Sequence, residues 1–245
     1  MAQLSSQKVP VKKHDLVNVD NQFIEAFIRD GNMVAFKLLF YIAGLDLDSE
    51  DIKSEFFKIT INLPDMIKVT NVSERRFKRN LHKMQTTTIS IIDEKSESYF
   101  SLLPKIVYDL KGKVSITMAK EVYQLVKKSK GNLTIIDSQR IYKLKGKHTT
   151  KMLLLLEHIS GFDIPRKLYT LEELNLLFDT KYKTYSHFEN NVLKNAQKEL
   201  ETNSKLSFTY EDKRDLTLAG KGRPRIVGLY ISPVGKRSYQ PKLKL

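Results

Sequence analysis

Five cationic side chains crowd the short segment 73–85, whose apolar spacing is typical of an amphipathic helix. Phe77, Leu81 and Met84 recur at intervals of four and three residues and so share one helical face. The cations lie around the rest of the helix beside a single acid, Glu74; they are Arg75, Arg76, Lys78, Arg79 and Lys83. A solvated surface helix is the alternative, but such helices usually carry both signs of charge. Because like charges repel, the segment predicts an anion opposite, and a DNA groove fits it.

A second polar surface is predicted on a long helix over 186–203. Phe188, Val192 and Ala196 are spaced to form an apolar stripe, which Leu200 continues and which belongs in a core. The opposite side carries Asn190, Asn191, Lys194 and Lys198. Asparagine can form two hydrogen bonds with adenine, and lysine can bind phosphate or guanine, although both are also ordinary surface residues. The basic and aromatic residues 181–185 precede this helix and favour a contact between its start and a DNA backbone.

Further cations lie in a glycine-rich connection between two predicted strands. Lys-Arg at 213–214 is followed by Gly-Lys-Gly-Arg-Pro-Arg at 220–225. A basic hairpin tip can follow the phosphates of a duplex, whereas a solvated loop is the plain alternative. The spacing of a phosphate-binding nucleotide loop is not met.

The overall composition also points to an anionic partner. Lys and Arg number 42 against 28 Asp and Glu, a net charge of +14 over 245 residues. Nucleic acid is the expected partner, and a generally basic protein kept in solution by its charge is the alternative. A membrane is disfavoured because no apolar run approaches the roughly 18 residues needed to span it. The first residues lack a signal-peptide core, so we expect a cytoplasmic protein. With no cysteine, disulfides and thiol chemistry are excluded.

The elements that would position these residues follow the same order in both halves. In the first half we expect helices from Asp15 to Gly44, a strand at 56–62, helices at 63–69 and 73–85, strands at 87–92, 99–108 and 113–118, and a helix at 119–128. In the second half we expect helices at 138–144, 147–160, 170–178 and 186–203, then strands at 206–210, 216–218 and 226–232. Capping boxes are predicted to start the last two helices at Thr170 and Ser186.

This order predicts an α+β protein of two tandem winged-helix domains, each a helix–turn–helix followed by a β-hairpin wing. We expect a loose basic arm at 1–14, an N-terminal domain at 15–130, a C-terminal DNA-binding domain at 131–235 and a basic tail at 236–245. The polar, glycine-containing stretch 129–132 marks the predicted boundary.

Three motifs in the second half carry a family resemblance. They are YTLEELNLLF at 169–178, YKTYSHFENNVLKNAQKEL at 182–200 and GKGRPRIVGLYIS at 220–232; VDNQFIEA at 19–26 fits more loosely. With these motifs the chain resembles the RepA- and RepE-like replication initiators of theta-replicating plasmids. The resemblance implies two winged-helix domains, monomers that bind repeated origin sites (iterons), and opening of the adjacent duplex. It also implies recruitment of a host initiator and the replicative helicase, and dimers that repress their own promoter and so affect copy number.

The same resemblance implies a set of DNA contacts in the C-terminal domain. Contacts from the helix and its preceding turn would come from Lys183, Thr184, Tyr185, Asn190, Asn191 and Lys194. Contacts from the wing would come from Lys221, Arg223 and Arg225. Members of the family often carry arginine where this chain has Glu189, Asn190 and Asn191. This difference should weaken nonspecific attraction to DNA, and it leaves the base-contacting residues open.

We expect no catalytic activity, no metal and no cofactor. A rolling-circle initiator would nick DNA with a tyrosine and a metal held by paired histidines, but no two of the five histidines are spaced as H-x-H or H-x-x-x-H. A winged-helix transcriptional repressor is the other alternative. Composition does not separate it from an initiator, because both act by binding duplex DNA.

Overall fold

The computed structural model describes residues 15–30, 33–45, 47, 52, 54–92, 97–127, 133–215, 217 and 224–235. The predicted arm at 1–14, linker at 129–132 and tail at 236–245 lie outside them. By its internal packing the chain divides into two compact units, whose described residues run from 15 to 23 and 33 to 133, and from 24 to 30 and 134 to 235. Helix α1 (Asn21–Asp30) is therefore divided between the units. The predicted domain limits, 15–130 and 131–235, stay a prediction.

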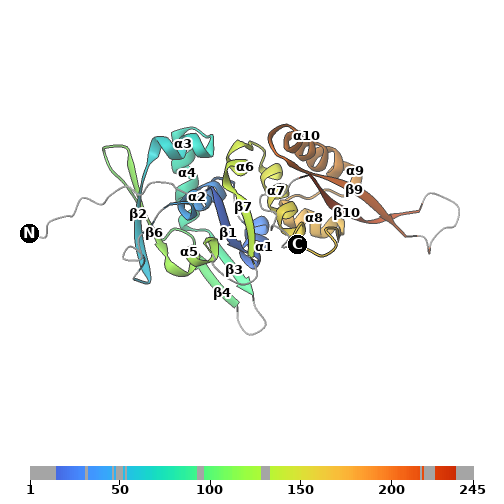
Figure 1. Cartoon of the computed structure of the whole chain (residues 1–245), viewed down its shortest axis with the longest axis horizontal. Helices are drawn as coiled ribbons and strands as arrows, with labels where there is room; N and C mark the ends of the chain where they lie inside the picture. The colour runs from blue at the N-terminus through green and yellow to red at the C-terminus, as the bar shows by residue number, and fades with distance from the viewer. Residues whose placement is uncertain are drawn as a thin grey trace, which may run out of the picture. The chain divides into compact units, whose positions relative to one another are not determined.

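The first unit contains both helices and strands (Figure 1). Their order is β1 (Leu16–Asp20), the start of α1, α2 (Met33–Ala43), β2 (Phe56–Asn62), α3 (Leu63–Thr70), α4 (Glu74–Gln85), β3 (Thr88–Ile92), β4 (Glu97–Ser101), β5 (Lys105–Tyr108), β6 (Lys113–Ala119) and α5 (Lys120–Val126). Strands β2, β6 and β5 form one antiparallel sheet in that order, and β3 pairs with β4.

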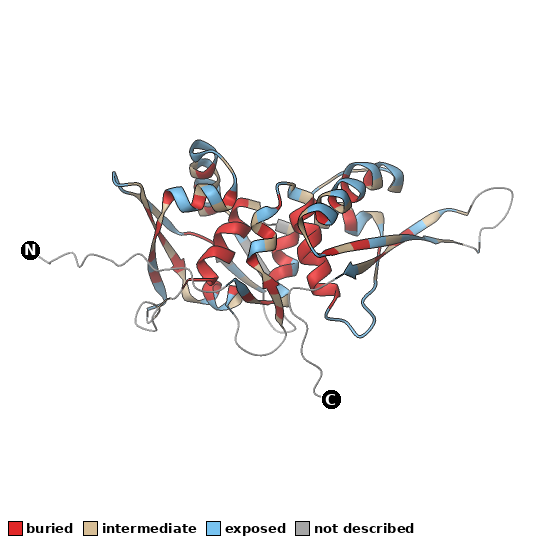
Figure 2. Ribbon diagram, turned by 45° about the horizontal axis from the view of Figure 1, so that its top comes forward, coloured by how far each residue is buried: buried red, intermediate tan, exposed pale blue. Residues whose placement is uncertain are grey.

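Helix α2 is the centre of this unit, because every residue from Val34 to Ala43 is buried (Figure 2). Its partners are α3, α4 and α5. Burial alternates along β2, where Phe57, Ile59 and Ile61 point into the core and their neighbours do not. This two-residue period is what a strand with one covered face requires.

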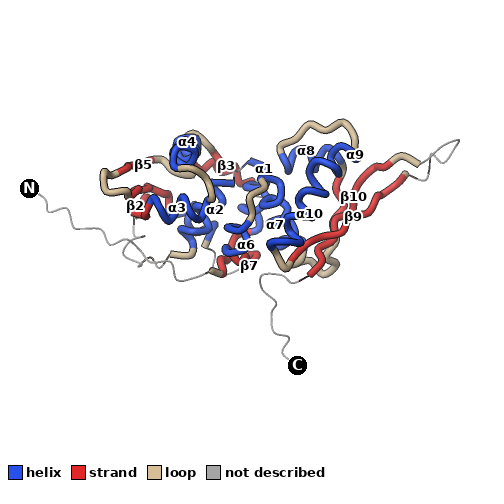
Figure 3. The backbone as a smooth tube through the Cα atoms, turned by 90° about the horizontal axis from the view of Figure 1, so that it is seen from above, coloured by secondary structure: helices blue, strands red, loops and turns tan. Residues whose placement is uncertain are grey.

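The second unit is built around α7 (Lys147–Ile159), in which every residue from Thr149 onwards is buried (Figure 2). The other elements are β7 (Leu133–Asp137), α6 (Ser138–Lys143), β8 (Lys167–Tyr169), α8 (Leu171–Phe178), α9 (Tyr185–Phe188), the π-helical turn η1 (Glu189–Leu193), α10 (Lys194–Asn203), β9 (Leu206–Arg214) and β10 (Ile226–Gly235). Strand β10 lies between β8 and β9, and β9 and β10 run side by side as a long hairpin (Figure 3).

Several sequence-based expectations for the elements are wrong. The segment from Leu16 to Asp20, predicted to be helical, is a strand. The Asp20 carboxylate accepts the backbone N–H groups of Gln22 and Phe23, and helix α1 therefore starts at Asn21. The strand predicted at 99–108 is two strands, interrupted at Leu102 and Leu103, which are buried. Strands β7 and β8 were not expected. Of the strand predicted at 216–218, Thr217 lies in a turn and the other two residues lie outside the described part.

Candidate nucleic-acid interface

Helices α3 and α4 form a helix–turn–helix with a three-residue turn. Asn71 ends α3 in the left-handed conformation, with φ of 54°, and its N–H donates to the carbonyl of Ile67 at 2.9 Å. Asparagine tolerates this conformation better than most residues. Ser73 then caps α4, its hydroxyl accepting the N–H of Arg76 at 3.4 Å. The turn is therefore set by the residue types that its geometry needs.

The apolar and cationic faces of α4 are arranged as the sequence predicts. Phe77, Leu81 and Met84 are completely buried. Four of the predicted contact residues are exposed, namely Arg75, Arg76, Arg79 and Lys83. Arg75, Arg79 and Lys83 recur at four-residue intervals, and Arg76 lies three residues before Arg79. Side chains at this spacing share one face, so α4 presents a continuous cationic stripe to solvent.

The fifth predicted contact on α4, Lys78, is engaged within the first unit. It forms an ion pair with Glu74 at 2.5 Å, and its ammonium lies over the ring of Tyr108, 5.2 Å from the centroid. His82, one turn further on, packs against the same ring at 6.0 Å between centroids. Tyr108 ends β5, so these contacts connect α4 to the β5–β6 hairpin.

The tip of the β5–β6 hairpin is closed by a compact turn. The carboxylate of Asp109 accepts the N–H groups of Lys111 at 2.8 Å and of Lys113 at 2.7 Å. Gly112 has φ of +74°, a conformation that side chains disfavour. This basic tip is the wing of the first unit.

Helices α8 and α9 form the helix–turn–helix of the second unit. The capping box predicted at Thr170 is present, since its hydroxyl accepts the N–H of Glu173 and the Glu173 carboxylate accepts the N–H of Thr170. Asn175 organises the turn: its amide donates to the carbonyl of Tyr182 and its oxygen accepts the hydroxyl of Thr180. The sequence analysis did not single out Asn175, because one asparagine late in a helix gives no distinctive signal.

The helix predicted at 186–203 begins earlier and is not a uniform α-helix. Its cap is Thr184, whose hydroxyl accepts the N–H of His187 at 3.3 Å, so the capping box expected at Ser186 is wrong. The N–H of Lys194 bonds to the carbonyl of Glu189, five residues back, which makes η1 a π-turn between α9 and α10. Such turns occur often at functional sites. We call the segment 185–203 the recognition helix.

The predicted contact residues at the start of the recognition helix lie at the surface. Lys183 and Thr184 are exposed. Tyr185 is half-buried, and its hydroxyl accepts the N–H of Leu171 at 2.9 Å, which fixes the start of α9 against the start of α8. Burial raises the pKa of Tyr185, so the phenol keeps its proton as a donor.

Asn190, Asn191 and Lys194 are exposed. The Asn191 amide donates to the carbonyl of His187 at 2.8 Å. The Lys194 ammonium donates to Asn190 at 2.8 Å and lies 3.2 Å from the carboxylate of Glu189. The face therefore carries amide groups and a cation that an acid partly neutralises.

Glu189 also connects the recognition helix to the hairpin. Its carboxylate accepts the hydroxyl of Tyr210 in β9 at 3.0 Å. Burial, followed by this hydrogen bond and the charge of Glu189, raises the pKa of Tyr210 to about 12. Tyr210 is thus a firm donor at neutral pH, and the helix and the wing are held together.

The structure describes the base of the wing of the second unit, up to Asp215 on one strand and from Pro224 on the other. Arg225 is exposed, and its carbonyl accepts the N–H of Asp215 at 2.9 Å. Arg214 donates to the carbonyl of Pro224 and to the carboxylate of Asp212. The predicted wing contacts Lys221 and Arg223 lie outside the described residues.

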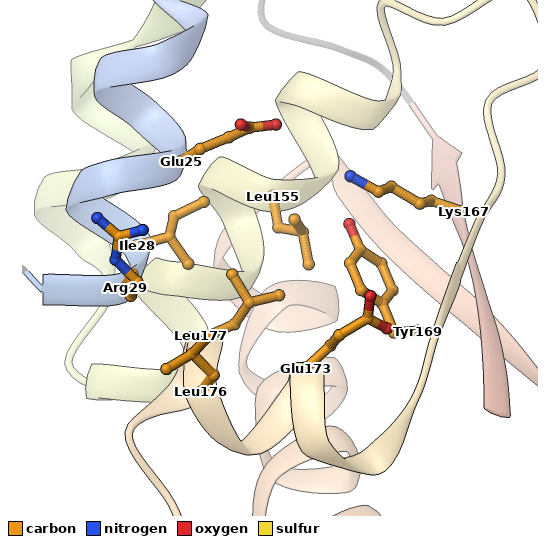
Figure 4. Close-up of a pocket in the computed structure, with 9 residues that line it drawn as sticks. All are labelled: Glu25, Ile28, Arg29, Leu155, Lys167, Tyr169, Glu173, Leu176 and Leu177. Carbon is orange, nitrogen blue, oxygen red and sulfur yellow. The ribbon is translucent and has the colours of Figure 1, made fainter. Parts of the chain in front are cut away.

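A pocket of about 250 Å³ lies within the second unit, between the second part of α1, α7, β8 and α8 (Figure 4). The polar side chains that line the pocket make contacts that stabilise the fold. Glu25 bonds to His158 at 3.1 Å, Glu173 closes the capping box, and Lys167 lies over the ring of Tyr169 at 5.4 Å. The hydrogen bond from His158 is the main cause that lowers the pKa of Glu25.

Among the residues that the structure describes, no group of three His, Asp or Glu side chains is arranged to hold a metal ion. None of the described helices has the length and apolar character that a membrane crossing requires.

Comparison with known proteins matches two family models to the chain. The model described as initiator replication protein, WH1, covers residues 16–157, and the model described as initiator Rep protein, WH2, covers residues 170–232. These models confirm the expected fold of two winged-helix domains. No curated protein matches the sequence at a significant level.

Several solved structures are similar to this chain, including the following two. The Pi initiator protein, solved in complex with iteron DNA, is 15% identical with a TM-score of 0.69, over 92% of this chain and 99% of that one. The structure of domains 2 and 3 of RctB is 9% identical with a TM-score of 0.44, over 87% of this chain and 81% of that one. The likeness to the Pi initiator shows a shared fold.

Proposed function

The chain belongs to the initiator replication protein family, and we propose that it is a plasmid replication initiator that binds repeated origin sites, or iterons, through its two winged-helix domains. Affinity comes from cations on the helices and wings, and discrimination between sequences comes from amide groups of the recognition helix. The protein acts by binding and not by catalysis.

The observation that carries this proposal is the cationic stripe of α4 on a folded helix–turn–helix. Arg75, Arg79 and Lys83 stand exposed on one face while the opposite face of the same helix is buried. A short helix of this kind fits the major groove, and its guanidinium groups can bind guanine or phosphate. The second helix–turn–helix gives the same chain a second reading element.

The recognition helix supplies groups suited to reading bases. The Asn191 side chain donates to the carbonyl of His187 through its nitrogen and not through its oxygen. The Asn190 side-chain oxygen accepts a hydrogen bond from Lys194. Contact with DNA would exchange the Asn190–Lys194 bond for bonds to base edges and phosphate. Since each amide offers both a donor and an acceptor, adenine is the base it matches best.

The wider role that we propose follows the family. Monomers bind the iterons, promote opening of the adjacent duplex and recruit a host initiator and the replicative helicase in the bacterial cytoplasm. Dimers, in exchange with monomers, repress the protein's own promoter. Membership of the initiator family supports these steps.

Footprinting on the DNA that flanks the coding sequence tests the proposal. Regularly spaced protected repeats, with binding that weakens steeply as salt rises, are the expected result. Protection of a single palindrome alone would favour a repressor. Cleavage of one strand would favour a nicking initiator, and the absence of salt-sensitive association would overturn DNA binding altogether.

A further inference from the structure

The first turn of α7 is attached to the recognition helix by one carboxylate. Glu199 in α10 accepts the N–H of Lys145 at 2.6 Å and the N–H of Gly146 at 3.1 Å, and it accepts the hydroxyl of Thr149 at 2.6 Å. Thr149 is buried. A carboxylate with this many short donors is held in one position, because charge-assisted hydrogen bonds are strong and directional.

Gly146 allows this close approach. A β-carbon at position 146 would lie 2.5 Å from the Glu199 carboxylate and 2.5 Å from the Thr149 hydroxyl. Both distances are too short for real contacts, so any side chain here would displace Glu199 or Thr149. The backbone at Gly146 is in an ordinary extended conformation, and the close packing alone therefore favours glycine.

The same stretch of α7 also holds the first helix of the helix–turn–helix. Lys147 pairs with Asp179, which ends α8, at 2.8 Å, and this bond is the main cause that lowers the pKa of Asp179. The buried ammonium of Lys151 donates to the carbonyl of Leu177 at 2.9 Å. Both helices of the motif are thus attached to residues 145–151.

We propose that Glu199 is a positioning residue for DNA recognition. By accepting hydrogen bonds from Lys145, Gly146 and Thr149, it fixes the recognition helix to the same segment, residues 145–151, that contacts α8. This inference rests on the proposed function. The geometry between α8 and the recognition helix decides which side chains reach the bases. Sequence-specific binding therefore depends on residues that do not touch DNA.

The residues that Glu199 grips lie outside the range of the second family model. That model covers 170–232, whereas residues 145–151 fall within the range of the first, 16–157. A fragment cut at the start of the second range would keep the cationic and amide groups but lose their common anchor.

The test compares two substitutions, each with a matched control, in the full-length protein. Glu199→Gln keeps the shape of the side chain and removes its charge, and Glu201→Gln removes an equal charge from an exposed position on the same helix. Thr149→Val removes the hydroxyl with little change of volume, and Thr149→Ser retains it. The probes are a duplex selected by the wild-type protein from a random library and a duplex of unrelated sequence, both measured well below the melting temperature of each variant.

We expect Glu199→Gln and Thr149→Val to lose about tenfold in affinity for the selected duplex and little for the unrelated one, a change equal to about 1.4 kcal/mol. Glu201→Gln and Thr149→Ser should keep the wild-type ratio between the two duplexes. Retained discrimination in both Glu199→Gln and Thr149→Val would overturn the proposal. An equal loss on both duplexes would also overturn it, because a merely weakened fold does not alter the ratio.

Amide hydrogen exchange without DNA separates this inference from the proposed function. Exchange at Lys145 and Gly146 should accelerate in Glu199→Gln and not in Glu201→Gln. This comparison tests the hydrogen bonds that Glu199 accepts from these two N–H groups. Unchanged exchange would show that Glu199 does not hold this turn. If exchange accelerates but neither wild type nor Glu201→Gln binds any duplex, the proposed function fails, and the role in recognition fails with it.

Discussion

The ammonium of Lys78 lies over the ring of Tyr108, so the cationic helix α4 is joined to the β5–β6 hairpin by one of its own cations. The Glu74 carboxylate forms an ion pair with the same ammonium. Cation–π and ion-pair contacts of this kind keep a side chain in place even where it is partly exposed. Four of the five cations of α4 are exposed, whereas the fifth, Lys78, connects the helix to the wing.

The first prediction compares Lys78→Ala with Arg79→Ala. Arg79→Ala should weaken binding to all duplexes and reduce the slope of log affinity against log salt by about 1, because one phosphate contact is lost. Lys78→Ala should leave that slope nearly unchanged while it loosens the hairpin. Salt titrations by fluorescence anisotropy measure both.

An equal fall in slope for the two variants would show that Lys78 binds phosphate as Arg79 does. Tyr108→Leu provides the matched change on the hairpin side. It removes the ring but no charge, so it should resemble Lys78→Ala in its salt slope.

The second prediction separates base recognition by the recognition helix from phosphate binding by the wing of the second unit. Asn191→Ala should change which base is preferred at one position of the site and cost about 1–3 kcal/mol there. Arg225→Ala, at the base of the wing, should weaken all sequences about equally. Binding to a set of duplexes with single base-pair changes measures the difference. A uniform loss in both variants would refute the assigned roles.

The third prediction concerns the buried Lys151. Its ammonium donates to the carbonyls of Leu177 and Arg29, at the ends of α8 and α1. Lys151→Met would leave these carbonyls without this donor, so the free energy of unfolding should fall by about 1–3 kcal/mol. Urea denaturation measures it. The exposed Lys198→Met on α10 should change stability by no more than about 0.5 kcal/mol, and equal stability of the two variants would contradict the prediction.

The fourth prediction concerns acid stability through Glu25. Its pKa is lowered from the ordinary 4.5, first by the hydrogen bond from His158 and then by the charges of His158 and Lys167. A carboxyl whose pKa is lower in the folded state stabilises that state above the ordinary value and loses this contribution as the pH falls through the lowered one.

Glu25→Gln should therefore melt below wild type at neutral pH, with a difference that shrinks as the pH falls below 4.5. Melting temperatures across this range measure it, with Glu201→Gln as the control. A difference that stays constant across the range would show that the charge of Glu25 is not responsible.

Local patterns in the sequence were sufficient to predict the two helix–turn–helix motifs. The spacing of Phe77, Leu81 and Met84 specified which face of α4 is buried, and the capping box at Thr170 specified where α8 begins. These signals are local: they depend on residues within one or two helical turns of one another. The order of the elements then sufficed to predict two winged helices.

Features that depend on distant partners could not be predicted. Strand β8 has three residues, too few for a periodic pattern, and exists because β10 pairs with it. Thr184 and Ser186 are both suitable caps, and the hydrogen bond between the Leu171 N–H and the Tyr185 hydroxyl, a contact with a distant residue, is consistent with the start at Thr184. Glu199 resembles any surface acid in the sequence, because its donors lie about fifty residues away.

The π-turn at 189–193 shifts the register of the recognition helix by one residue. An α-helix advances by about 100° for each residue, and η1 holds one residue more than a regular turn. Deleting one residue here would restore a plain helix while Ala196 and Leu200 stay seated in the core. The residues before the turn would then rotate by about 100° about the helix axis, and Phe188 among them would leave its buried position. The extra residue therefore keeps Phe188 before the turn and Ala196 and Leu200 after it buried on one side of the helix.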